Sequence, residues 1–158
     1  MDEIRPGLWT WTGDHQEWTP EMTWGPEVRS YALQIADERY LFDPVLPAPS
    51  ADAVLLTVPW HRRDTDELGL DVLDEPPPGI ETRPGFFAEE KVYWLPQHRA
   101  IVIGDAFMDG NTAPLEWATD DPEAPKRLRA LLELPFELVC PTHGDVTDRA
   151  AFEASIAD

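Results

Sequence analysis

Three apolar segments of this chain each end beside residues that can bind a metal ion or transfer a proton. The segments are 53–58, which leads into Trp60-His61-Arg62-Arg63-Asp64, 101–103, which leads into Gly104-Asp105, and 138–140, which leads into Pro141-Thr142-His143-Gly144. Polar groups just past strand ends are where α/β folds gather their sites, because a rigid scaffold holds the loops there. The glycines beside Asp105 and His143 also indicate unusual backbone angles or a close approach of another segment. We therefore expect one site assembled from three strand ends.

The order of elements predicts an α/β protein in which most strands precede the longer helices. Apolar patterns predict strands at 4–11, 28–35, 39–42, 53–58, 91–95, 100–103 and 136–140. A short helix is expected at 64–68, one longer helix begins near Asp121-Pro122, and the last helix is capped by Thr147. Neither a repeat nor a linker divides the chain, and its length suits one core. We expect a single domain over residues 1–158.

The charge of the chain argues against two classes of partner. Thirty-one acidic residues face twelve basic ones, which gives a formal net charge of -19. Such a surface repels nucleic-acid phosphates and anionic membranes, so we expect neither as a partner. The excess of acidic over basic residues is typical either of a halophilic protein or of the compositional bias of a GC-rich genome.

Two further features concern location and redox chemistry. No apolar run approaches the roughly 20 residues that span a bilayer, and the first residues lack a secretory pattern. We therefore expect a cytoplasmic protein. Cys140 is the only cysteine, which excludes an intrachain disulfide and a thiolate zinc site, and its apolar neighbours predict a buried strand position.

The order of these segments resembles the metallo-β-lactamase superfamily, in its small glyoxalase-II-like hydrolase form. Arg5-Pro6-Gly7-Leu8-Trp9 is similar to the first strand of that family, and residues 28–35 and 40–44 resemble its next two strands. Gly104-Asp105-Ala106-Phe107 matches the Gly-Asp that supplies a metal-bridging carboxylate, and Pro141-Thr142-His143-Gly144 matches the segment with the last histidine. The resemblance implies an αββα sandwich, with two mixed β-sheets packed face to face and helices outside.

Most ligands of the family's two-metal centre are missing. After Thr57, the His-x-His-x-Asp-His motif would fall on Val58, Trp60, Arg62 and Arg63, none of which is a ligand. A shift by one residue instead places His61 and Asp64 on motif positions. Phe86, after Pro84-Gly85, stands where a further histidine is expected. A two-zinc centre of the usual kind is therefore excluded.

The remaining candidate metal ligands are His61, Asp64, Asp105 and His143. Two imidazoles and two carboxylates suit one divalent ion, such as zinc, iron or manganese. If His61 and Asp64 lie on one helical turn, their i, i+3 spacing places them on one face. Asp64, Asp105 and His143 are also candidate catalytic groups, because they can accept or donate the proton of a metal-activated water. The structural alternatives are hydrogen bonds to loop backbone, a helix cap and stabilised strand ends.

Candidate substrate-binding residues surround this set. Arg62 and Arg63 suit an anionic substrate group, although a guanidinium also repels a metal ion. In the family that the chain resembles, the loop after the first strand overhangs the active site, which implies that Trp18 and Trp24 form an apolar wall. Trp60 and Phe86 complete the predicted set. In contrast, Asp43, His15, His98 and Glu90 are expected to be turn or surface residues.

Two functions remain open at this point. The first is a divergent hydrolase with at most one metal ion, acting on a small ester, thioester, lactone or phosphoester. The second is an inactive pseudoenzyme that keeps the fold and serves as a binding or assembly module. A metal-free variant of the first would use His61 or His143 as the base and an arginine as the anion clamp. The sequence does not decide whether an ion is bound at all, and a homodimer is one option for the oligomeric state.

Overall fold

Two six-stranded mixed β-sheets form the protein, described here by a computed structural model that covers residues 1–113 and 120–156. The strands are β1 (Asp2–Arg5), β2 (Leu8–Asp14), β3 (Glu27–Ile35), β4 (Glu38–Phe42), β5 (Ala53–Leu55), β6 (Asp71–Val72), β7 (Glu81–Pro84), β8 (Lys91–Leu95), β9 (Ala100–Met108), β10 (Asn111–Thr112), β11 (Leu138–His143) and β12 (Thr147–Asp148). The helices are α1 (Thr65–Leu68), α2 (Ala124–Ala130) and α3 (Arg149–Ser155), with short 3-10 helices η1 (Pro59–Arg62), η2 (Pro96–His98) and η4 (Leu131–Glu133).

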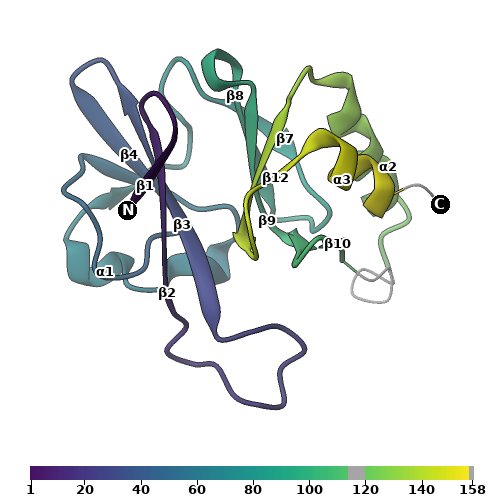
Figure 1. Cartoon of the computed structure of the whole chain (residues 1–158), viewed down its shortest axis with the longest axis horizontal. Coiled ribbons are helices and arrows are strands. Elements are labelled where there is room, and N and C mark those ends of the chain that lie inside the picture. The colour runs from purple at the N-terminus through teal and green to yellow at the C-terminus, as the bar shows by residue number, and fades with distance from the viewer. Residues whose placement is uncertain (114–119, 157–158) are drawn as a thin grey trace.

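The two sheets are consecutive in sequence and lie face to face. The first sheet has the order β1-β2-β3-β4-β5-β6, and the second has the order β12-β11-β9-β8-β7 with β10 paired to β9. Figure 1 shows α1 beside the first sheet and α2 and α3 on the outer side of the second sheet. This arrangement confirms the predicted α/β sandwich. In the described residues, no helix is long and apolar enough to cross a membrane.

Alternation along the strands divides the core into layers. On β9, Ala100 and Val102 face the first sheet, whereas Ile101 and Ile103 pack in the layer that contains residues of α2 and α3. Both faces of β9 are therefore apolar, which explains its continuous apolar run. A third apolar cluster covers the outer face of the first sheet and includes Leu68 of α1.

The structure shifts several predicted boundaries. The strand expected at 4–11 is a hairpin of β1 and β2, and Gly7 at its turn has φ +81°. Helix α3 is capped by Asp148 instead of Thr147, because the Asp148 carboxylate accepts a hydrogen bond from Ala151 N at 2.9 Å. Helix α2 begins at Ala124, and Asp121 caps the preceding turn by accepting from Glu123 N at 3.0 Å. Cys140 is buried, as expected.

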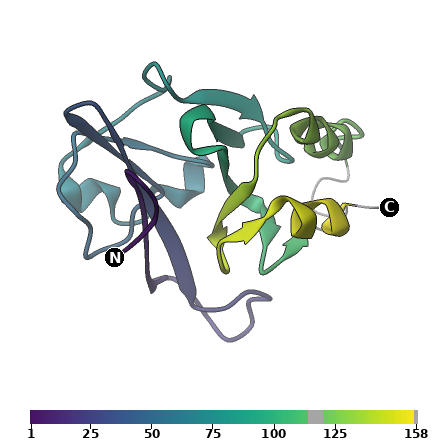
Figure 2. The ribbon, with the colours of Figure 1, turned by 45° about the horizontal axis from the view of Figure 1, so that its top comes forward.

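Parallel pairing brings polar strand ends together. Strands β4 and β5 are parallel in the first sheet, and β9 and β11 are parallel in the second. The register between β9 and β11 shifts from the Ile103–Pro141 pair to the Met108–His143 pair, so β9 contains extra residues there. Such a bulge can re-aim a side chain, and it contains Asp105. The loop between β2 and β3 projects from the body of the molecule in both views (Figures 1 and 2).

Candidate metal centre

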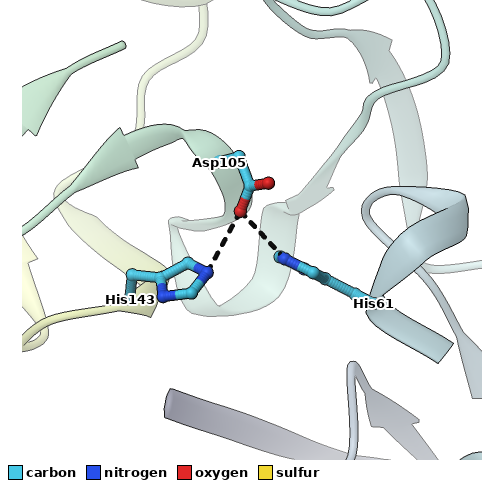
Figure 3. Close-up of side chains that lie close together, drawn as sticks. All are labelled: His61, Asp105 and His143. Carbon is cyan, nitrogen blue, oxygen red and sulfur yellow. Dashed lines mark ion pairs between the residues drawn. The ribbon is translucent and has the colours of Figure 1, made fainter. Parts of the chain in front are cut away.

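His61, Asp105 and His143 form a compact cluster between the two sheets. One potential ligand atom from each residue lies within 4.8 Å of the others. His61 Nε2 is 2.8 Å and His143 Nε2 is 3.1 Å from the same oxygen, Asp105 Oδ1 (Figure 3). The two histidine side chains are only 3% and 5% exposed, and Asp105 is 17% exposed. Three of the four predicted ligands therefore meet.

Two glycines allow the backbone to place these residues. A Cβ on Gly104 would lie 2.4 Å from the Thr57 hydroxyl oxygen, so only glycine fits beside Asp105. Gly144 has φ +95°, and a Cβ there would lie 2.9 Å from the Cα of Asp109. The left-handed conformation and the close approach both favour glycine. The glycines next to Asp105 and His143 thus have the roles that the sequence indicated.

Asp43 is a site residue that sequence reasoning missed. Its carboxylate is fully buried, and Oδ2 lies 2.8 Å from His61 Nδ1. Thr57 N donates to Oδ1 at 2.8 Å, and the Thr57 hydroxyl donates to Oδ2. This contact orients the ring so that Nε2 faces Asp105, which is how outer-shell carboxylates position metal-binding histidines. Asp43 was expected to be a turn residue, and its φ of 45° fits that as well. Its position after β4, at the same sheet edge as the other ends, was the available signal.

The charges of the cluster are coupled. Burial would raise the pKa of Asp105, but the imidazoles of His143 and His61 outweigh it and hold that pKa far below its usual range. Burial lowers the pKa of His143, and Asp105 offsets this only in part. For His61, burial opposes protonation, but Asp43 and Asp105 together raise its pKa. The centre therefore contains an ionised carboxylate beside one histidine that favours the neutral form, the form that binds metals.

The donor set fits one divalent ion. Asp105 Oδ1 is buried and accepts no directed hydrogen bond, although two ring nitrogens lie near it. Both imidazoles form close ion-pair contacts with this oxygen, so the three ligand atoms converge on one position. Ligand atoms around a tetrahedral zinc lie about 3.3 Å apart, only slightly more than the 2.8 and 3.1 Å found here. Nitrogen and carboxylate donors suit zinc, iron or manganese.

Asp64, the fourth predicted ligand, lies outside the cluster. Its carboxylate accepts hydrogen bonds from Leu46 N at 2.8 Å and from Gln16 Nε2 at 3.2 Å. The expected i, i+3 relation with His61 fails because Arg63, with φ 45° and ψ -126°, separates η1 from α1. The two residues therefore do not share a helical face.

The two arginines also differ from expectation. Arg62 forms an ion pair with Asp66 at 2.6 Å and is exposed. The Arg63 guanidinium donates to the carbonyl oxygens of Asp43 at 2.6 Å and Arg29 at 3.1 Å. Arg63 therefore joins backbone segments beneath the centre through Nη1, whereas its Nε is buried without a hydrogen-bond partner.

Of the predicted aromatic residues, Trp24 and Trp60 contact the cluster directly, whereas Phe86 does not. Trp24 packs edge-on against the His143 ring with 4.8 Å between centroids, and Trp18 supports it by donating to the Trp24 carbonyl at 2.7 Å. Trp60 is 51% exposed and donates its indole N–H to Asp105 Oδ2 at 2.6 Å. Phe86 is 1% exposed and packs in the core beneath α2, so it offers no surface to a substrate.

A cavity of about 280 Å³ lies beside the cluster and is lined by Trp60, which contacts Asp105, although none of the three cluster residues lines it. Its lining residues are mostly polar: Asp14, His15, Gln16, Glu17, Val45, Trp60, Arg62, Arg63, Asp64 and Asp66. His15 was expected to be solvated but also contacts Trp24 edge-on at 5.0 Å. Asp64, Arg62 and Arg63 therefore lie on the wall of a cavity beside the candidate centre.

Comparison with known proteins identifies the fold. No family model and no curated protein matches the chain. Solved structures do match it over nearly its whole length. A metallo-β-lactamase from Erythrobacter litoralis has 13% identity and a TM-score of 0.68, with coverage of 99% of this chain and 89% of that one. FIM-1 from Pseudomonas aeruginosa, in a mono-zinc form, has 15% identity and a TM-score of 0.65, with coverage of 98% and 92%.

A metallo-β-lactamase from Hirschia baltica gives a similar result, with 16% identity, a TM-score of 0.61 and coverage of 99% and 95%. The chain therefore has the metallo-β-lactamase fold, which confirms the resemblance seen in the sequence at the level of fold.

Proposed function

We propose that this protein is a hydrolase that uses one divalent metal ion held by His61, Asp105 and His143. The proposal rests on the imidazole nitrogens of His61 and His143, which converge on one buried oxygen of Asp105. Three protein ligands with an open position are typical of catalytic metal sites. A mono-zinc structure among proteins of this fold supports a one-ion centre.

The proposed substrates are small esters, thioesters, lactones or phosphoesters. A bound ion would polarise a carbonyl or phosphoryl oxygen and lower the pKa of a water molecule. The chain's own residues define the rest of the site. Asp43 orients His61, Trp24 shields His143 from solvent, and the exposed ring of Trp60 borders the cavity. The cavity of about 280 Å³ favours a small substrate.

Elemental analysis of protein purified without chelator tests this proposal. We expect about one equivalent of zinc, iron or manganese per chain, as for a three-ligand catalytic site. Asp105→Ala and His143→Ala should abolish this content, whereas His98→Ala, far from the cluster at η2, should not. Absence of metal, together with no change in melting temperature on adding these ions, would refute the metal centre.

Hydrolysis of a panel of activated esters, thioesters, lactones and phosphoesters tests the second part. Activity should disappear with chelator and in the two ligand variants. The alternative function is a pseudoenzyme that retains the fold as a binding or assembly module. It is favoured by Phe86, which is buried where a ligand histidine is expected, and by Trp60, which covers part of Asp105. A protein that binds metal but hydrolyses none of the panel would support it.

A further inference from the structure

Two residues adjacent in sequence contact the two oxygens of Asp105 separately. His61 Nε2 lies 2.8 Å from Oδ1, and the Trp60 indole nitrogen donates to Oδ2 at 2.6 Å. Figure 3 shows Oδ1 directed between the two imidazoles and the other oxygen directed away from them. The short helix η1 therefore provides one candidate metal ligand and one hydrogen-bond donor to the same carboxylate.

From this geometry we propose that Trp60 is a positioning residue that keeps Asp105 as a ligand through one oxygen only. The inference rests on the proposed metal centre. A carboxylate can bind an ion with one oxygen or with both, and a hydrogen bond to Oδ2 favours the first mode. Hydrogen bonds to an ionised acceptor are short and strong, as the 2.6 Å distance here illustrates. One coordination position is thereby left for water or substrate.

The local structure holds Trp60 in this role. Pro59 begins η1, and His61 N donates to the Val58 carbonyl at 3.1 Å, which closes the turn. The Trp60 ring packs edge-on against Phe87 with 5.8 Å between centroids. Its other side is exposed to solvent, so the ring is not needed to fill the core. The indole is therefore fixed by one aromatic contact and one hydrogen bond to Asp105.

The experiment compares wild type with Trp60→Phe, which retains an aromatic ring beside Phe87 but removes the donor. Trp9→Phe, a tryptophan substitution on β2 beside Arg39, is the matched control. Each protein is loaded with Co²⁺, and its visible absorption is recorded, because four-coordinate Co²⁺ absorbs more strongly than ions of higher coordination number. Zinc affinity is measured by competition with a chelating dye, and melting temperatures check that all three proteins are folded.

We expect the Co²⁺ spectrum of Trp60→Phe to weaken and shift as Oδ2 joins the coordination sphere. We also expect the zinc affinity to fall about tenfold, at the lower end of the effect of removing an outer-shell partner. Trp9→Phe should match wild type in both measurements. If wild type binds one ion and Trp60→Phe has the same spectrum and affinity, the role of Trp60 is refuted while the metal centre stands. If wild type binds no ion, both proposals are refuted.

A second measurement needs no metal. The indole N–H resonance of Trp60, assigned by its loss in Trp60→Phe, should be shifted downfield by its bond to a carboxylate. In Asp105→Ala, which retains Trp60, that resonance should move upfield to the position of a solvated indole. An unchanged resonance in Asp105→Ala would refute the contact on which the proposal rests.

Discussion

Two carboxyl groups, those of Asp105 and Glu90, lie close to Gly104, and their surroundings are opposite in kind. Asp105 is surrounded by titratable or aromatic side chains, namely His61, His143 and Trp60. Glu90, 3% exposed, instead accepts backbone N–H bonds from Phe86 at 2.7 Å and Ala106 at 3.1 Å. A Cβ on Gly85 would lie only 2.1 Å from Glu90 Oε1, so the backbone encloses this carboxyl group closely.

The pKa values of the two groups shift in opposite directions. Imidazoles hold the pKa of Asp105 far below its usual range, whereas burial raises the pKa of Glu90 to about 7. The comparison shows that burial of a carboxyl group does not by itself indicate a functional site. The type of partner distinguishes a reactive position from a structural one. Asp105 lies in the proposed metal centre, and Glu90 joins the loop before β8 to the bulge of β9.

The largest expected effect is on stability, from Glu90→Ala. This change leaves two buried backbone N–H groups without acceptors, and each costs about 1–3 kcal/mol. We expect the free energy of unfolding to fall by about 4 kcal/mol, measured by urea denaturation. Asp105→Asn should lower it by less than half as much, although it should abolish metal uptake. Equal losses in the two variants would remove the distinction between the two carboxyl groups.

The pH dependence of stability should also separate them. Folded Glu90 retains its proton up to a pKa of about 7, whereas the unfolded chain loses it near 4.5. Between these values the folded state binds more protons, so stability falls as pH rises, by up to about 3 kcal/mol in total. Urea denaturation across this pH range, with Glu90→Gln as the reference, measures this loss of stability. A wild type that gains stability relative to Glu90→Gln as pH rises would contradict the assignment.

A smaller effect is expected from Asp43→Asn. The amide keeps the size of the side chain but weakens the charge-assisted contact with His61 Nδ1. Because outer-shell partners of metal-binding histidines contribute about 10–100-fold to affinity, zinc binding should weaken by roughly tenfold. Competition with a chelating dye measures this. An affinity equal to that of wild type would show that Asp43 has only a structural role in the turn after β4.

The smallest effect is expected from Asp64→Ala. Asp64 binds Leu46 N and Gln16 on the cavity wall and does not reach the cluster. Metal content should therefore stay at the wild-type value, and the same elemental analysis checks this. Loss of the ion in Asp64→Ala would restore Asp64 as a ligand, as first predicted from the sequence.

The sequence predicted the fold and part of the site. Apolar runs predicted most of the strands, the resemblance in segment order implied the sandwich, and the polar residues after strand ends nominated His61, Asp105 and His143. The roles of Asp43 and Glu90 were missed because His61 and Ala106, which contact them, are 18 and 16 residues away in sequence. Glu90 follows Glu89 and precedes Lys91, a pattern typical of a surface, and only the fold brings Ala106 N to it. Asp64 was nominated by helical spacing that the conformation of Arg63 interrupts.

The position of His143 on β11 has a consequence for how the chain would acquire the proposed ion. His61 follows a strand of the first sheet, and Asp105 and His143 belong to the second. The three ligands can meet only after the sheets have docked and β11 has inserted between β9 and β12. An ion bound there would act as a non-covalent cross-link that favours the completed structure over any partly folded state. Removal of the ion should therefore speed unfolding, and a fragment that ends before β11 should not bind it tightly.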